Sequence, residues 1–318
     1  MAVNLGDLVS TTLRNVSKDI ADNVTNDNGF LAHLNSKGNI KKSVSGGREI
    51  DEAVMHGLNS SVQFYDGYDT FTPPTTGQQV IDMATYNWKQ LGGFVAISGK
   101  EQMQNRSEEQ RFDFLETRKK QLEANMMNTF ATSLHSLGTG SAGKELGGLQ
   151  LLVSDDSTAA GTIGGIDQVA NPFWQNKFSA SASTSATTVQ ARFNSMWLQC
   201  KRGADQTDLI VLDDDFYGYY WGSLQANQRF MGNSFGDAGG DADLMYKKAK
   251  VIYDDQCTNK RCYFLNSKYL FFKYAEGRWF DVGKSRTIQN ADYDVVPIFV
   301  MGNLTCSNRA RQGVIIAS

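Results

Sequence analysis

The sequence predicts an α+β fold. Residues 107–137 carry apolar side chains at helical spacing, and patterns typical of strands dominate from residue 249 to the end of the chain. Helical and strand patterns are intermixed between these segments, but no alternation of strand, helix and strand repeats along the chain. A mixed fold without a regular βαβ unit is therefore expected.

The composition predicts a soluble globular protein. The chain has 318 residues, of which 41% are hydrophobic, so it can bury a core and falls outside the disordered class. Its 31 basic and 34 acidic side chains give a formal net charge of -3, which argues against a surface built mainly to grip nucleic acid. No apolar run approaches the ~18 residues of a membrane span, and the polar N-terminus lacks the apolar core of a secretion signal.

The four cysteines are too few for a disulfide scaffold, so a reducing cytoplasm is expected. Cys257 and Cys262 are spaced to face each other across a tight hairpin. A bridge between them fits this spacing, but two free thiols are the expected state. The three histidines lie far apart and give zinc binding no support.

Residues 1–42 are expected to form a helical N-terminal arm with one narrow apolar stripe. This stripe consists of Val9, Leu13, Val16, Ile20 and Val24. It packs either on its own domain or along a neighbouring copy.

Residues 43–100 are expected to form a long polar hairpin. Two extended segments, 48–72 and 78–98, flank a turn at Pro73, Pro74 and Gly77. A hairpin that is polar on both faces buries little within its own subunit and needs external support. An ordinary surface hairpin is one interpretation; a projecting arm that clasps another subunit is the favoured one.

A long helix is predicted to follow. Ser107 and Gln110 fit a capping box, and Gly138 stands where a helix-ending glycine is expected. Such a helix forms a rod of roughly 45 Å. Its predicted inward positions are Phe112, Leu115, Leu122, Met126, Phe130, Leu134 and Leu137. Its exposed face carries Arg111, Glu116, Arg118, Lys119, Lys120 and Glu123.

Beyond a connector rich in Gly, Ser, Ala and Thr, the elements are shorter. Thr188 is expected to open a helix that stops at Gly203, and residues 209–212 to form a buried strand. Asp213–Asp215 are expected to cap a second helix, which precedes a glycine-rich loop over 232–243. The later strands are predicted at 251–253, 262–265, 269–274, 295–301 and 313–317.

The segment 138–145 matches the phosphate-loop pattern G-x-x-x-x-G-K only in part. Glu145 stands where that loop needs Ser or Thr for magnesium, and a helix rather than a strand precedes the segment. A helix stop followed by a connector is the favoured interpretation. Nucleotide binding and hydrolysis at this loop are kept as a remote hypothesis.

The remaining motifs give no case for an enzyme. Asp213–Asp215 and Asp254–Asp255 could bind a divalent metal, but helix capping is favoured. Ser141 and Lys144 form a lone S-x-x-K tetrad, and no nucleophile is paired with a base. Arg309 and Arg311 are weak candidates for phosphate contact. We therefore expect no catalytic residue, no metal and no cofactor.

The order of these elements resembles the major capsid proteins of tailed bacteriophages, which have the Hong Kong 97-type shell fold. The stretch from Gly147-Gly148-Leu149 through Gly164-Gly165-Ile166-Asp167 to Asn171-Pro172-Phe173-Trp174 is similar to the segment after the spine helix in that family. The resemblance covers essentially the whole chain. It implies an N-terminal arm (1–42), an extended loop (43–100) and a spine helix (101–144) of the peripheral domain. It further implies an axial domain (145–275), peripheral return strands (276–302) and a C-terminal axial strand (303–318).

The resemblance implies a protein that self-assembles into hexamers and pentamers of an icosahedral head enclosing double-stranded DNA. The implied partners are copies of the chain itself, a portal protein, separate scaffolding and cement proteins, and packaged DNA held by weak non-specific contact. The implied location is the virion capsid, assembled in the host cytoplasm. A cellular encapsulin-like compartment of the same fold is the alternative, and no membrane contact is expected.

The resemblance also implies residues at subunit contacts. The expected interface residues are Arg48, Glu52, Phe64, Tyr65, Tyr68, Tyr86, Trp88, Phe94, Arg111, Arg118 and Trp174. The expected capsomer-centre loop includes Asn233, Phe235 and Asp237. Lys89 and Lys100 lie in or near the extended loop, but nothing singles out either one for the lysine–asparagine crosslink known in some family members.

Overall fold

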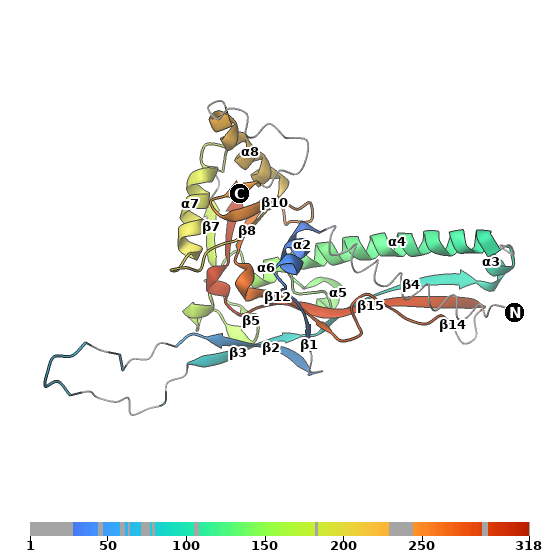
Figure 1. The fold of residues 1–318 in the computed structure, drawn as a ribbon, viewed down its shortest axis with the longest axis horizontal. Coiled ribbons are helices and arrows are strands. Elements are labelled where there is room, and N and C mark those ends of the chain that lie inside the picture. Colours follow the sequence, from blue (N-terminus) through green and yellow to red (C-terminus); the bar gives the residue numbers. More distant parts are fainter. Residues whose placement is uncertain are drawn as a thin grey trace.

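The computed structural model describes most of the chain. The described residues are 28–43, 47–57, 61–62, 64–70, 77, 80–104, 108–181, 184–228, 244–287 and 292–317, with the backbone alone at 102–104, 108–117 and 225–228. The expected apolar stripe of the N-terminal arm and the expected capsomer-centre residues lie outside them. Figure 1 shows three parts: a long rod, a lobe rising from one end of it, and a hairpin arm that projects away from the rod.

The rod is built on a six-stranded sheet. Its longest strands, β4 (Lys89–Ser98) and β15 (Tyr293–Cys306), pair antiparallel from Lys89 opposite Gly302 to Ser98 opposite Tyr293. The other strands of the sheet are β1 (Ile40–Ser43), β12 (Leu270–Ala275), β13 (Asp281–Val282) and β14 (Arg286–Thr287), and of these β12, β13 and β14 pair with β15.

The long helix lies along this sheet. After the short α3 (Gly99–Gln104), α4 spans Glu108–His135, which confirms the helix predicted over 107–137. Gly93 of β4 allows the close approach, since a Cβ there would lie 2.6 Å from Leu122 Cδ1. Met126, Phe130 and Leu134 are buried beneath the helix. Among the described residues, no helix combines the length and the apolar character needed to cross a membrane.

The α7–α8 lobe contains the second sheet, of strand order β7-β16-β11-β8-β10-β9. Its helices α7 (Val189–Cys200) and α8 (Asp214–Gln228) cover one face, where Phe193 packs against Phe264 and Tyr220. The strands are β7 (Lys177–Ser181), β8 (Leu209–Leu212), β9 (Met245–Tyr246), β10 (Ala249–Tyr253), β11 (Arg261–Leu265) and β16 (Gly313–Ala317). The strands predicted at 209–212, 251–253, 262–265 and 313–317 are confirmed.

Short elements join these parts. The arm contains β2 (Glu49–Met55) and β3 (Ile81–Asn87), which pair antiparallel. The connecting elements are α2 (Gly29–Ser36), α5 (Gly140–Gly143), α6 (Leu149–Leu152), β5 (Thr162–Ile163), β6 (Ile166–Asp167), η1 (Pro172–Trp174), η2 (Ser267–Tyr269) and η3 (Arg309–Arg311). All four cysteines are free and buried, as expected for Cys257 and Cys262.

Two sequence predictions about which residues belong to which part of the fold differ from the observed sheets. The extended segment predicted over 78–98 is two strands: β3 pairs with β2 in the arm, whereas β4 pairs with β15 in the rod. The strand β12 also belongs to the rod, so the passage from the lobe to the rod falls at residues 266–269, before the expected boundary at 275. In both cases the assignment of the segment to the rod follows from its pairing with β15.

Arg309 holds together the loops between the two sheets. Its side chain is fully buried and donates hydrogen bonds to the carbonyl oxygens of Leu152 (2.6 Å) and Trp174 (3.1 Å). Three side-chain acceptors complete its shell: Gln168, Ser154 and Asn176. Burial lowers the pKa of Arg309 to about 10. The weak prediction that Arg309 contacts phosphate is therefore wrong, because no surface of its side chain is exposed.

We expect Arg309→Met to destabilise the subunit by about 3 kcal/mol or more, because several buried acceptors would lose a charged donor. Denaturant unfolding of the purified subunit measures this loss. Arg286→Ala removes an exposed arginine and serves as the control, with an expected change within about 0.5 kcal/mol. Equal stability of the two variants would contradict the role given to Arg309.

Candidate assembly surfaces

The base of the arm is fixed to its own subunit. Ile50 and Val54 of β2 and Ala84 and Tyr86 of β3 are buried on the inner face of the hairpin. The Tyr86 hydroxyl donates a 2.9 Å hydrogen bond to the carbonyl oxygen of Cys306, at the end of β15. Burial raises the pKa of Tyr86 far above its ordinary value, so this hydroxyl stays protonated.

The outer part of the arm exposes large apolar side chains. Phe64 and Tyr68 are fully exposed, and Val62 and Tyr65 are largely so. On the outer face of the hairpin, β2 and β3 expose Met55, Ile81 and Met83. A monomeric soluble protein rarely gathers so many exposed apolar side chains on one projection, and such a surface marks an interaction site.

A local turn presents two of the aromatic side chains. The backbone amide of Asp69 donates to the carbonyl oxygen of Asp66 (2.8 Å), and the Asp66 amide donates to the Asp69 carboxylate (2.9 Å). Tyr65 and Tyr68 flank or lie within this turn. The hydrogen bonds between Asp66 and Asp69 therefore stabilise the local backbone from which both side chains project.

The arm is also acidic. Residues 49–88 contain six Asp and Glu residues and no Lys or Arg. Since the whole chain has 34 acidic and 31 basic side chains, the remainder carries 28 acidic and 31 basic ones. The numbers of acidic and basic side chains are nearly equal over the whole chain, but the arm is acidic and the rest of the chain is mildly basic.

The sheet of the rod exposes Phe94 on the face turned away from α4. Phe94 packs edge to face on Phe299 of β15, with ring centres 6.0 Å apart, and is still about 61% exposed. The Arg278 guanidinium lies 5.1 Å from the centre of the Phe299 ring. This face therefore offers an apolar surface beside a positive charge.

Arg118 connects α4 to α3 within the subunit. Its guanidinium donates to both carboxylate oxygens of Glu101, at 2.8 and 3.2 Å, and to the Ala96 carbonyl oxygen at 2.5 Å. The hydrogen bonds from Arg118 lower the pKa of Glu101. The other arginine predicted on this helix, Arg111, has no described side chain.

Several expected interface residues instead stabilise the subunit itself. Tyr86 and Trp174 are buried, and the Trp174 indole donates to the Ile163 carbonyl oxygen (2.8 Å), so the prediction that these two lie at a subunit contact is wrong. Glu52 pairs with Lys273 at 2.8 Å. The Trp88 indole donates to the Gly47 carbonyl oxygen at 2.9 Å. Arg48 is exposed and lies 3.9 Å from Glu49.

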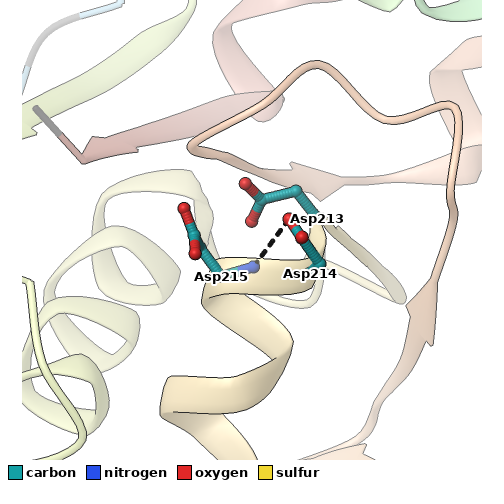
Figure 2. Close-up of side chains that lie close together, drawn as sticks. All are labelled: Asp213, Asp214 and Asp215. Atoms are coloured by element: carbon teal, nitrogen blue, oxygen red, sulfur yellow. Dashed lines mark hydrogen bonds between the residues drawn. The ribbon is translucent and has the colours of Figure 1, made fainter.

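The three successive aspartates have distinct environments (Figure 2). Asp213 is buried and accepts hydrogen bonds from the backbone amides of Phe216 (2.9 Å) and Lys260. Burial raises its pKa. Asp213 therefore caps α8, as the sequence predicts, while Asp214 and Asp215 face the solvent.

The glycine-rich loop over 138–145 follows α4 and packs on itself. The Glu145 carboxylate accepts a 3.0 Å hydrogen bond from the Gly140 amide, one of the groups that a phosphate would need. Ser141 and Ala142 have positive φ, so this segment differs from the regular helix start of a phosphate loop. These features match the predicted connector.

A buried contact between a histidine and a carboxylate, which the sequence analysis missed, anchors α2 to the body. His135 Nε2 and Asp254 Oδ2 lie 2.9 Å apart, and Asn28, the N-cap of α2, donates to the same oxygen at 3.5 Å. Burial alone would raise the pKa of Asp254, but the hydrogen bond from His135 and the amide of Gln256 outweigh it and leave the pKa lowered. Residues more than 100 apart meet here, which no local pattern could indicate.

The fold is similar to solved shell structures. The capsid asymmetric unit of cyanophage A-1(L) matches with a TM-score of 0.60 and 15% identity over 88% of this chain and 90% of that chain. The capsid of the empty GTA particle matches with a TM-score of 0.55 and 10% identity over 89% of both chains. The holo-SrpI encapsulin complex of Synechococcus elongatus matches with a TM-score of 0.54 and 7% identity over 89% of this chain and 86% of that chain.

These matches define the class of fold. The chain has the Hong Kong 97-type shell fold, and the resemblance to tailed-phage capsid proteins is confirmed at the level of the fold. No protein-family model matches the sequence, and no curated protein sequence is significantly similar to it.

We expect Asp254→Asn to flatten the acid side of the stability curve. A carboxyl group with a lowered pKa contributes stability that is fully present above its unfolded pKa of about 3.9 and is lost as the pH falls through its folded value. The free energy of unfolding of the wild type should therefore fall more steeply than that of the variant between about pH 5 and pH 3. Urea unfolding at a series of pH values measures both slopes.

Asp255→Asn changes the exposed neighbour of Asp254 and should keep the wild-type slope. Parallel curves for Asp254→Asn and the wild type would contradict the stabilising role of the Asp254 carboxylate.

Proposed function

We propose that this chain is a major capsid protein that self-assembles into hexamers and pentamers of an icosahedral head around double-stranded DNA. The observation that carries the proposal is the exposed aromatic arm on a subunit with the Hong Kong 97-type fold. A surface of this kind is costly on a monomer and becomes favourable once another molecule covers it.

The shape of the subunit supports head-to-tail association. The arm points left in Figure 1, whereas the rod of α4, β4 and β15 extends to the right. A ring with cyclic symmetry brings different surfaces of adjacent copies into contact. The arm of each subunit would then lie on the body of the next, and its acidic side chains would meet a mildly basic surface.

The proposed subunit contacts follow from exposure. Phe64, Tyr65, Tyr68 and Phe94 are the interface residues of the sequence analysis that offer apolar surface. The loop with Asn233, Phe235 and Asp237 stays a predicted capsomer-centre contact. The expected peripheral and axial domains correspond in this proposal to the rod and the α7–α8 lobe.

The proposal includes partners and a location. A portal protein, separate scaffolding and cement proteins, and weakly held packaged DNA are the partners of a capsid protein. The virion capsid is the proposed location, after assembly in the host cytoplasm. The role is structural, with no reaction assigned to the chain.

A cellular compartment shell is the second candidate, because the encapsulin complex matches nearly as well as the phage capsids. The two candidates differ in content, since a phage head contains DNA and a compartment encloses cargo protein. Nuclease protection and protein analysis of particles purified from the native source distinguish them.

We expect a subunit with a truncated arm to fold but not to assemble. The amide of His56 donates to the carbonyl oxygen of Val80 at 3.0 Å, so a two-residue Asn-Gly turn can replace residues 57–79 without opening β2 and β3. The variant should keep the unfolding midpoint of the wild type and form no closed particles in electron micrographs. Closed particles of normal size would contradict the proposed function.

A variant with a full-length arm distinguishes the effect of the aromatic contacts on assembly from the effect of the arm's length. Replacing Phe64, Tyr65 and Tyr68 by Ser should raise the protein concentration needed for assembly by roughly tenfold or more, because exposed aromatic anchors dominate such contacts. Val169→Ser removes another exposed apolar side chain and should leave that concentration unchanged.

A further inference from the structure

Basic side chains gather around Trp197 at one end of the α7–α8 lobe. The Nζ atoms of Lys247 and Lys201 lie 3.9 and 4.7 Å from the centre of the indole ring. Arg202 and Lys248 follow them in the chain and are exposed. Trp197 itself is only 8% exposed, so its ring forms the floor beneath the charges. We call these residues the Trp197 cluster.

The charges of this cluster are uncompensated within the described part of the subunit. None of its four basic side chains forms an ion pair there, and the two carboxylates that follow Lys201 and Arg202 most closely in the chain have other partners. Asp205 pairs with Lys268 at 2.9 Å, and Asp208 lies 3.6 Å from His33. Like charges on one ring repel each other, and the attraction of each to the ring offsets part of this cost. An acidic surface placed against the cluster would offset the remaining repulsion between these like charges.

Acidic side chains gather at the other end of the same strands. Asp214 and Asp215 are exposed at the start of α8, directly after β8 (Figure 2), and Asp255 is exposed in the turn after β10. The register of β8 and β10 places Leu212 opposite Tyr253, so the two turns are neighbours. We call Asp214, Asp215 and Asp255 the acidic turns.

The two groups are at opposite ends of the lobe. Strands β8 and β10 are parallel, with the Trp197 cluster at their amino ends and the acidic turns at their carboxyl ends. In Figure 1, α7 forms one flank of the lobe. The turn after β10 lies by α2, since Asn28, Gly29 and Asp255 line one cavity. A single subunit therefore cannot bring the two groups together.

Building on the proposed assembly, we propose that the Trp197 cluster of one subunit binds the acidic turns of the next subunit around each capsomer. A ring pairs one surface of each copy with a different surface of its neighbour, and these two surfaces have opposite charge. Every subunit carries both surfaces, so in a closed ring each Trp197 cluster can meet the acidic turns of a neighbour. This contact acts between lobes and is separate from the contact made by the arm.

A nucleic-acid backbone is the other kind of partner that a basic cluster could bind. The second copy is favoured because the acidic turns stand at the far end of the same two strands, an arrangement that DNA binding does not require. The net charge of -3 also gives little general attraction for DNA.

Charge exchange tests the proposed contact. One variant carries Lys201→Glu and Lys247→Glu, a second carries Asp214→Lys and Asp215→Lys, and a third carries all four substitutions. Asp213 is left unchanged because it caps α8. We expect each pair to raise the protein concentration needed for assembly by roughly tenfold, and the combination to restore most of the loss. Assembly is followed by sedimentation and electron microscopy, and thermal unfolding of the free subunits shows that each variant folds.

Lys260→Glu is the matched control. Lys260 is an exposed lysine beside the acidic turns, so the same charge reversal there should leave assembly unimpaired. High salt should weaken wild-type assembly, because exposed charges are screened.

The outcomes separate this contact from the proposed function. If the variant with all four substitutions folds but does not regain assembly, the contact alone is overturned. Loss of DNA binding by the Lys201 and Lys247 variant, with normal assembly, would make the cluster a nucleic-acid contact and would also overturn it. A wild-type chain that stays monomeric would overturn the proposed function and this contact together.

Discussion

The antiparallel pairing of β4 with β15 is the constraint on which the rest of the structure depends. This ladder runs from Lys89 to Ser98 and provides the platform for α4. Because β4 follows β3 almost directly, the same ladder fixes the direction in which the arm leaves the body. At the same end of the ladder, β15 continues to Cys306, whose carbonyl oxygen accepts a hydrogen bond from the Tyr86 hydroxyl. The chain then passes through Arg309 into the second sheet. One strand therefore positions the rod, the arm and the lobe relative to one another.

Polar groups inside the subunit and polar groups on its surface have different roles. Arg309 and the pair of His135 with Asp254 are buried and hydrogen-bonded to distant segments, so they stabilise one arrangement of the loops. The charges of the arm and of the lobe are exposed and cost little in the free subunit. Charges of that kind add modestly to affinity and strongly to the choice of partner and orientation. The interior thus determines the shape of the subunit, and in the proposed assembly the surface charges would determine how copies are oriented.

Local patterns predicted much of this fold. Helical spacing and the Ser107 capping box located α4 within two residues at each end, and Asp213 caps α8 as its position after a buried strand indicates. The separation of β3 from β4 was missed because the extended segment over 78–98 has no internal break in composition. The partner of β4, β15, also lies about 200 residues later in the chain. Long-range pairing of this kind leaves no local trace in one sequence.

Of the aromatic residues predicted at subunit contacts, some are exposed and others are buried. Phe64 and Tyr68 lie among polar residues and are exposed, as the sequence predicts. Tyr86 also lies between polar residues, and Trp174 is followed by two of them, yet both are buried because their polar atoms donate to carbonyl oxygens of other segments. Amphipathic aromatic side chains suit either environment, so composition alone could not distinguish them.

Two separate contacts between neighbours would make assembly selective in a way that one contact could not. Once the arm lies on a neighbouring subunit, the second contact between the lobes becomes intramolecular and benefits from a high effective concentration. Both contacts are satisfied together only over a narrow range of angles between subunits. Each can therefore be weak enough to release a misplaced copy, while the pair holds a correctly placed one. An acidic arm adds to this selectivity, because two arms repel each other and a basic body attracts them.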